Sequence, residues 1–181
     1  MNLPRKIREE ILVKMYGKTI VWAYFLNQKT NKEDEYLLWG GADIATILPI
    51  TEKGKVITTV EFMQGANKLI HQLPGGLIDP KETPEAAVKR ELLEETGYKA
   101  KRIIRLGKPV WENCRNSRTK TYLFLGLDCQ KIQKPNPEQT EHISTRLIPL
   151  YKWMEKLQKT IEEPHAISAT FRAQRHLKKF L

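Results

Sequence analysis

Several features that mark large classes of proteins are missing from this sequence. Cys114 and Cys129 are the only cysteines among 181 residues, and they have no metal-like spacing. A reduced, cytoplasmic protein is therefore expected. No apolar run approaches the roughly 18 residues of a membrane-spanning helix. The N-terminal stretch MNLPRKIREEI lacks the apolar core of a signal peptide, so none is expected.

The sequence also lacks repeats, low-complexity tracts and any long block of Lys and Arg, although its net charge is +10. That charge favours anionic partners such as nucleotides, nucleic acids or acidic surfaces. A solubilising basic surface is the alternative interpretation. Because the positive residues are spread through both ends and the middle of the chain, a dedicated nucleic-acid binder is not favoured.

The most informative stretch is GGLIDPKETPEAAVKRELLEETGY, residues 75–98. Thr83 suits the N-cap of a helix, and Pro84 suits its first position, where a missing N–H costs nothing. Gly97 supplies the left-handed residue that ends many helices. A loop followed by a helix of about three turns is therefore predicted.

Three acids of this helix, Glu91, Glu94 and Glu95, fall within roughly 100° of one another around its axis. Val88 and Leu92 lie beside them, so the acids border a core. Like charges in such a place repel one another and are costly to bury. A hard divalent cation would resolve the conflict, and Mg²⁺ commonly binds carboxylates together with substrate phosphates. A solvated acidic helix face is the alternative.

The spacing of the fixed residues in this stretch resembles the Nudix box at every position. A chance match is on the order of one in a million for a chain of this length. The resemblance implies a Nudix hydrolase with an α/β/α sandwich fold. The residues that carry it are Gly76, Glu82, Arg90, Glu91, Glu94, Glu95 and Gly97.

The resemblance also implies roles for individual residues. Glu82 and Arg90 would brace the loop against the helix, while Gly76 and Gly97 would be structural. Glu94 would be either a further metal ligand or the group that orients water. The implied ligands of Mg²⁺, or of Mn²⁺, are the Gly75 carbonyl, Glu91, Glu94 and Glu95.

Strands are predicted on both sides of the helix, where β-branched and aromatic residues stand between turn signals. This order predicts an α/β protein of the α+β type, with a mixed sheet packed by helices. Residues 1–41 are expected to form a small strand subdomain and residues 42–181 the hydrolase domain. Ile167, Phe171 and Leu177 mark the apolar stripe of the last helix. The predicted strands are 9–16, 19–26, 35–39, 44–50, 55–62, 69–73, 102–107, 120–128 and 144–149, and the later helices are 151–161 and 165–180.

Outside the box, EYLLWGGADIATILPITEKGKVITTVEFMQ and EHISTRLIPLYKW resemble segments of ADP-ribose and nucleotide-sugar pyrophosphatases. That resemblance implies cleavage of the diphosphate in a nucleoside diphosphate linked to another group. It also implies a homodimer that exchanges its N-terminal strands. The chain departs from the group at Met63, where arginine is usual, and near Asn113, where a proline is common. Hydrolysis of a nucleoside triphosphate or a capped RNA end is therefore an alternative, and a non-catalytic nucleotide-binding regulator is a third.

Candidates for the general base and the substrate contacts follow from chemistry and position. The base would be Glu94 or a glutamate ahead of the last strand, with Glu141 preferred over Glu138 by the same resemblance. Phosphates would be held by cations, and a base would stack on an aromatic ring. These substrate candidates are Arg115, Arg118, Lys120 and Trp111.

Overall fold

The computed structural model describes residues 2–15, 17–137 and 142–180. The chain forms two compact units, Met1–Asp43 with Trp111–Lys120, and Ile44–Val110 with Thr121–Leu181. The first unit thus includes a later segment that no local sequence signal marks, and the predicted boundary at residue 41 stays a prediction. No helix in the described ranges is long and apolar enough to cross a membrane.

The first unit is built on a three-stranded antiparallel sheet. Its strands, in spatial order, are β1 (Arg5–Met15), β2 (Lys18–Asn27) and β3 (Lys32–Gly40). The predicted hairpin is present, and each of its strands is longer than predicted. The segment 111–120 joins β3 through its backbone. The N–H of Trp39 donates to the Asn116 carbonyl over 3.0 Å, and the N–H of Arg118 donates to the Trp39 carbonyl over 2.8 Å.

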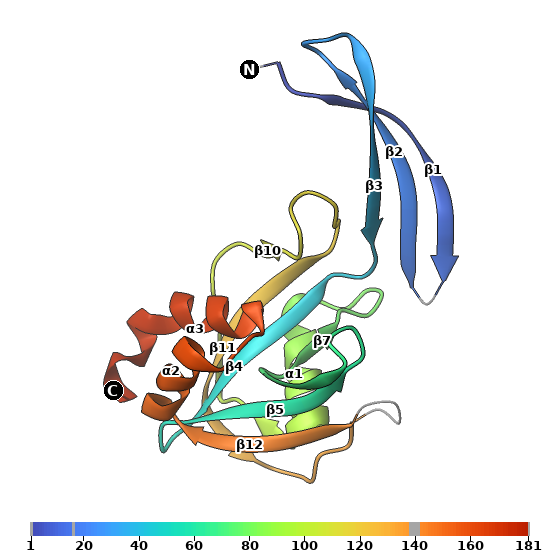
Figure 1. Ribbon diagram of the computed structural model, residues 1–181. Coiled ribbons are helices and arrows are strands. Elements are labelled where there is room, and N and C mark those ends of the chain that lie inside the picture. Colours follow the sequence, from blue (N-terminus) through green and yellow to red (C-terminus); the bar gives the residue numbers. More distant parts are fainter. Residues whose placement is uncertain (1, 16, 138–141, 181) are drawn as a thin grey trace. The chain divides into compact units, whose positions relative to one another are not determined.

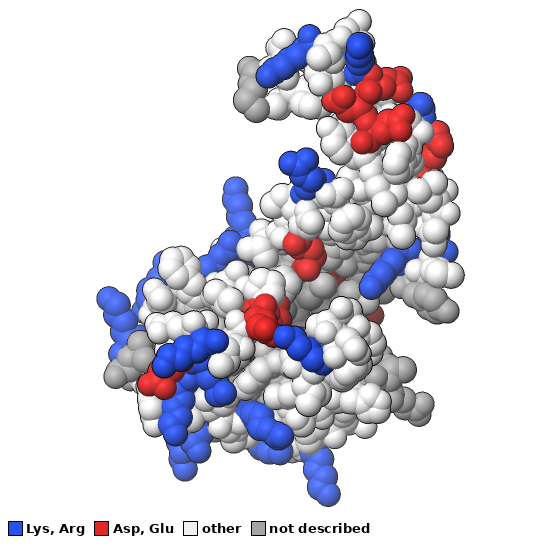
Figure 2. Space-filling model, in the orientation of Figure 1, with Lys and Arg blue, Asp and Glu red and all other residues white. Residues whose placement is uncertain are grey.

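The second unit holds a mixed sheet with the strand order β10-β11-β4-β5-β12. Strands β11 and β4 are parallel, and β12 pairs with β5 in the antiparallel sense. Lys and Arg side chains stand out around this unit in Figure 2. The strands are β4 (Ile44–Thr51), β5 (Lys55–Met63), β6 (Lys68–Gln72), β7 (Gly75–Leu77), β8 (Tyr98–Lys99), β9 (Arg102–Arg105), β10 (Val110–Trp111), β11 (Lys120–Lys131) and β12 (Ile143–Pro149).

Helices cover both faces of this sheet (Figure 1), which confirms the predicted fold class. Neighbouring residues of β4 point to opposite faces, as the two-residue period of a strand requires. Ile47 packs with Val88 of the first helix, whereas Leu48 packs with Trp153 of the second. The helices are α1 (Pro84–Thr96), α2 (Leu150–Lys159) and α3 (Pro164–Leu177), followed by the 3₁₀ turn η1 (Lys178–Phe180).

Helix α1 begins and ends as its sequence predicts. The Thr83 hydroxyl accepts from the N–H of Ala86 over 3.2 Å, and Pro84 occupies the first position. Gly97 closes the helix in the left-handed conformation with φ 75°, and its N–H donates to the Leu93 carbonyl over 2.8 Å. Each device satisfies a backbone group that a helix end leaves open, so the limits of α1 are set locally.

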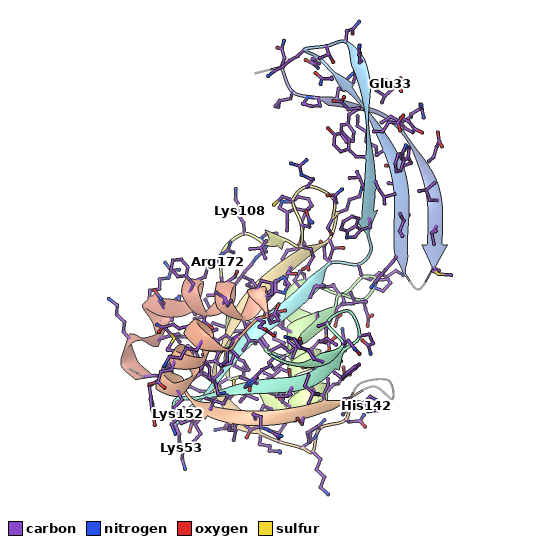
Figure 3. All side chains as sticks on the ribbon, in the orientation of Figure 1. Glu33, Lys53, Lys108, His142, Lys152 and Arg172 are labelled. Carbon is purple, nitrogen blue, oxygen red and sulfur yellow. The ribbon has the colours of Figure 1, made fainter. Side chains whose placement is uncertain are left out.

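The predicted apolar stripe of the last helix is partly wrong. Ile167 is 43% exposed and Phe171 is 70% exposed, so neither belongs to the core. Large residues were expected to mark the stripe, but small ones let this helix lie close to the sheet. Arg172 helps to hold it, donating to the Leu106 carbonyl over 3.0 Å (Figure 3). The residues that α3 buries are Ala166, Ala169, Thr170, Ala173 and Leu177.

His71 on β6 joins the sheet to α2. Its Nε2 lies 2.6 Å from the Thr58 hydroxyl, and its ring meets the Trp153 ring edge to face at 5.7 Å. Burial lowers the pKa of His71 below its usual value, and the positive charges of Lys156 and Arg146 lower that pKa further. The neutral imidazole is therefore the form that the fold favours.

We expect His71 to make the protein less stable in mild acid. Because the folded pKa lies below the unfolded value of about 6.5, its stabilising contribution is complete above that pH and is lost as the pH falls through the folded pKa. Denaturant unfolding of the wild type and of His71→Gln, measured between about pH 7.5 and 5, tests this expectation. The wild type should lose more free energy of unfolding over that range, and equal losses would contradict it.

Candidate active site

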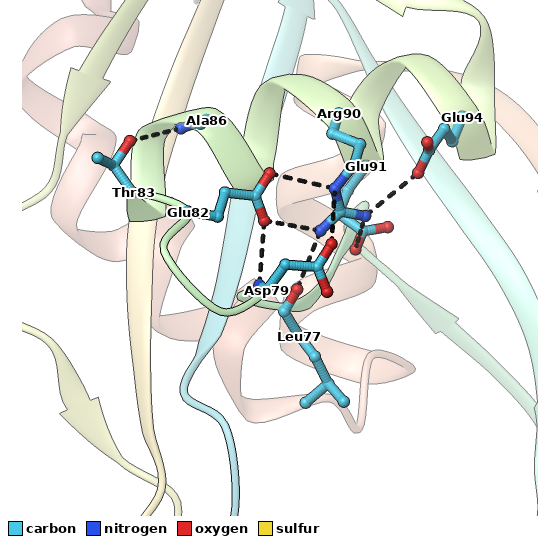
Figure 4. A network of polar contacts seen from close by, with 8 residues as sticks. All are labelled: Leu77, Asp79, Glu82, Thr83, Ala86, Arg90, Glu91 and Glu94. Atoms are coloured by element: carbon cyan, nitrogen blue, oxygen red, sulfur yellow. Dashed lines mark hydrogen bonds and ion pairs between the residues drawn. The ribbon is translucent and has the colours of Figure 1, made fainter. Parts of the chain in front are cut away.

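The guanidinium of Arg90 holds together the acidic residues of the box (Figure 4). Its Nε and Nη2 bind the two carboxylate oxygens of Glu82 over 3.2 and 3.0 Å. Its Nη1 lies 2.7 Å from Glu91 Oε1 and 3.2 Å from Glu94 Oε2. Its Nη2 also donates to the Leu77 carbonyl over 3.0 Å. One side chain of α1 is thereby bonded both to the loop before the helix and to two acids of the helix.

Glu82 and Arg90 stabilise the charged forms of each other. The hydrogen bond from Arg90 lowers the pKa of Glu82, and the backbone N–H of Asp79, 3.1 Å away, lowers it further. The pKa of Arg90 is raised, first through Glu82 and then through Glu91 and Glu94. This geometry is what a brace between loop and helix requires.

Two of the helix acids face inward. Glu91 is 7% exposed and Glu95 is 3% exposed, although both are charged residue types. The backbone of β7 lies close beside them. An added Cβ at Gly76 would lie 2.7 Å from the Glu91 carboxyl carbon, and one at Gly75 would lie 2.8 Å from the Thr46 Cα. Only glycine allows these approaches.

Among the described residues, four acids lie within ion-pair distance of one cation, Arg90. Lys89, the nearest neighbour of Arg90 in sequence, instead pairs with Glu85 on the exposed side of α1 over 2.7 Å. The donors are carboxylate oxygens, which suit a hard divalent cation. In the described residues, no group of three or more His, Cys, Asp or Glu side chains is arranged to hold a metal ion. The acids around Arg90 on the loop and on α1 are Asp79, Glu82, Glu91 and Glu94.

The loop after β11 is anchored to the end of α1. The N–H of Asn136 donates to the Glu94 carbonyl over 2.7 Å, and the N–H of Ile132 donates to the Gly97 carbonyl over 2.9 Å. The candidate bases Glu138 and Glu141 follow in this loop and lie outside the described residues. Sequence reasoning missed these anchors because backbone hydrogen bonds carry no side-chain signature.

Two further contacts of the box residues have no signature in the sequence. Asp79, in the loop before the helix, has a carboxylate oxygen 3.9 Å from Arg90 Nε. The Thr145 hydroxyl of β12 donates to the Glu95 carbonyl over 3.2 Å, which joins the edge of the sheet to the last turn of α1. No spacing in the sequence signals this contact, because the two residues are far apart in the chain.

The predicted substrate contacts all belong to the first unit. Trp111 and Arg115 line a cavity of about 550 Å³ together with Phe25 and Tyr36, whose rings meet edge to face at 5.5 Å. The Nζ of Lys120 lies 4.7 Å from the centre of the Trp111 ring. The cavity therefore combines aromatic faces with a guanidinium.

Arg118 has a carboxylate partner within its own unit. Its guanidinium binds both oxygens of Glu9 on β1, with Nη1 at 3.4 Å from Oε1. Together with Lys6, it lowers the pKa of Glu9 to about 2. Binding of a phosphate by Arg118 would therefore compete with this ion pair.

Comparison with known proteins supports the interpretation of the box. The family model of the NUDIX domain matches residues 42–168. An ADP-ribose pyrophosphatase of Bacillus subtilis (strain 168) is 37% identical over 60 residues, 33% of this chain and 32% of that protein. An ADP-sugar pyrophosphatase of Mus musculus is 28% identical over 134 residues, 68% of this chain and 61% of that protein. The chain thus spans less than two thirds of the length of either relative.

The fold agrees with that of a solved structure. A crystal structure described as an ADP compounds hydrolase superposes with a TM-score of 0.82, covering 97% of this chain and 95% of that chain. At 21% identity this likeness concerns the fold. The family match decides the family, since it covers well over half of the chain and contains the whole network around Arg90. The resemblance noticed in the box is thus confirmed, and the chain belongs to the Nudix family.

Proposed function

We propose that the protein is a Mg²⁺-dependent pyrophosphatase that cleaves a nucleoside diphosphate linked to another group, of the ADP-ribose or nucleotide-sugar type. The products are a nucleoside monophosphate and a phosphorylated second product. The observation that carries the proposal is the burial of two carboxylates, those of Glu91 and Glu95, one turn apart on α1. Buried carboxylates of this kind are stabilised by a divalent cation.

The metal would be held by the Gly75 carbonyl, Glu91, Glu94 and Glu95, with Mn²⁺ as an alternative to Mg²⁺. Bound there, it would neutralise the diphosphate and lower the pKa of an attacking water. Arg90 keeps one oxygen of Glu91 in place, so the other oxygen has a fixed direction. Fixed ligands of this kind lower the cost of reorganisation during phosphoryl transfer.

A proton must leave the attacking water as the P–O bond breaks. Glu94 is a candidate acceptor because its side chain is 41% exposed, unlike its buried neighbours on α1. Glu141 remains the preferred base and Glu138 the other candidate. The described residues just before Glu138 are anchored to α1, where the N–H of Asn136 donates to the carbonyl of Glu94.

The named activities of the two relatives support a diphosphate-linked substrate. The departure at Met63, which follows Glu61 and Phe62 on β5, removes a cation that the related group usually has there. The net charge of +10 favours a more highly charged substrate. Hydrolysis of a nucleoside triphosphate or of a capped RNA end is therefore the second candidate.

We also propose that the protein works as a homodimer. One face of the first unit's sheet carries an apolar patch in register, with Ile20 between Val13 and Trp39, and Trp22 opposite Leu37. Val13 and Trp39 are each 41% exposed, and Leu37 is 39% exposed. Contiguous apolar surface of this kind commonly marks an interface. A second copy of the chain would cover it.

We expect wild-type protein with Mg²⁺ to release a nucleoside monophosphate from ADP-ribose or a nucleotide sugar, and EDTA to stop that release. The measurement is product analysis over a panel that also includes dinucleoside polyphosphates, nucleoside triphosphates and a capped RNA. Activity confined to triphosphates or capped RNA would favour the second candidate. Nucleotide binding without hydrolysis of any substrate would favour a non-catalytic regulator.

Glu95→Gln should lower kcat by about 100-fold or more, because it removes a carboxylate from the proposed metal site. The matched control is Glu85→Gln, an exposed acid of the same helix that pairs with Lys89, and its kcat should stay close to wild type. Circular dichroism checks that both variants fold. Near wild-type turnover of Glu95→Gln would contradict the metal assignment.

In the same assay, a larger drop in kcat for Glu138→Gln than for Glu141→Gln would reverse the preference between the two bases.

Trp39→Lys is expected to weaken the dimer by about 10-fold or more, since it places a charge in the apolar patch. Phe171→Lys, at a more exposed aromatic residue of the second unit, is the control and should leave association unchanged. Sedimentation equilibrium measures the dissociation constant. A wild-type protein that stays monomeric at micromolar concentration would refute the dimer.

A further inference from the structure

Cations from three separate segments gather on one side of the second unit. Two flank the turn between β4 and β5, one lies on β12 and three lie on α2. All are exposed. We call this set the basic face, and it consists of Lys53, Lys55, Arg146, Lys152, Lys156 and Lys159.

The fold brings these segments together at the start of α2. The N–H of Leu150 donates to the carbonyl of Gly54 over 3.0 Å, so the turn that carries Lys53 lies against the first turn of the helix. Figure 3 shows Lys53 and Lys152 on the same part of the unit, and Figure 2 shows blue side chains there. Along α2, Lys152 and the two later lysines are four and three residues apart, so they form one stripe about 10 Å long.

Acids also stand beside members of the basic face: Glu155 lies among the lysines of α2, and Glu52 precedes Lys53 but pairs with Lys101 at 2.6 Å. Some other lysines of the unit have carboxylate partners, as Lys68 has with Glu162 at 2.6 Å. The members of the basic face form no ion pair with a carboxylate in the described part of the chain. Lys156 and Arg146 both lie near enough to His71 to lower its pKa, although burial is the larger cause.

The surroundings of α2 indicate which class of anionic partner the basic face suits. A helix that binds a membrane surface inserts its apolar side, but here that side is used in the core, where Trp153 is fully buried. One aromatic ring of α2, that of Tyr151, lies outside the core. Tyr151 is 58% exposed, and the Nζ of Lys152 lies 5.9 Å from its centre. Unpaired cations beside an exposed aromatic ring are the components with which proteins hold single-stranded nucleic acid.

We propose that the basic face binds single-stranded polynucleotide, with the lysines on successive phosphates and Tyr151 stacked on a base. This goes beyond hydrolysis of a small diphosphate and does not depend on it. It gives the chain a surface on which an RNA substrate, or a nucleic acid that is not cleaved, would be retained. The sequence does not favour this role because the cations are scattered along the chain and meet only in the fold.

The test compares two charge-matched variants. One is Lys152→Glu/Lys156→Glu/Lys159→Glu on the basic face, and the other is Arg5→Glu/Lys29→Glu/Lys32→Glu, at exposed cations of the first unit. Binding of single-stranded RNA and of single-stranded DNA, each of about 12 nucleotides, is measured by fluorescence anisotropy between about 50 and 200 mM salt. The first variant should bind at least about 10-fold more weakly, and its salt slope should fall by about 2, since roughly 0.7 of a counterion is released per phosphate contact. The second variant should bind like wild type.

Tyr151→Ala separates stacking from charge, and it should weaken binding about 10-fold without changing the salt slope. Equal losses in the two charge variants would refute the basic face and leave only bulk charge. No saturable binding by the wild type to either polynucleotide would refute it as well. The RNA and DNA arms identify which polynucleotide is preferred. Hydrolysis of ADP-ribose should be unchanged in every variant, so failure of the binding proposal leaves the proposed catalytic function intact.

Discussion

One guanidinium among several carboxylates is the constraint on which the rest of the site depends. Arg90 bonds at once to Glu82 in the loop and to Glu91 and Glu94 on the helix, so loop and helix cannot move independently. The helix limits at Thr83 and Gly97 fix where these side chains stand. Four acids thus meet one cation in the described residues, and carboxylate oxygens are ligands that suit a hard divalent metal.

Much of this arrangement could be predicted from sequence because it is local. The cap at Thr83, the left-handed Gly97 and the stripe of glutamates all lie within one short stretch, where spacing determines geometry. The core side of α3 could not be predicted in the same way. Its alanines carry little hydrophobic signal, and only the approach of the sheet shows that they, rather than Ile167 and Phe171, are buried.

Features that depend on contacts between distant segments could not be predicted from the sequence. The segment 111–120 joins the first unit through backbone bonds at Trp39, which any residue types could make. The basic face has the same origin, since Lys53 and Lys152 meet only because the carbonyl of Gly54 accepts from the start of α2. The second unit thus buries acids along α1 while it exposes cations along α2, and a net charge alone reveals neither.

The first unit consists of two separate segments of the chain, which affects when it can fold during synthesis. Its three strands leave the ribosome first, but the segment 111–120 that completes the unit follows roughly 70 residues later, which is on the order of several seconds of synthesis. During that interval the strands lack a part of their own fold, while residues of the second unit are still being added. The first unit therefore cannot be completed before the whole of α1 has been synthesised, so the synthesis of the two units overlaps.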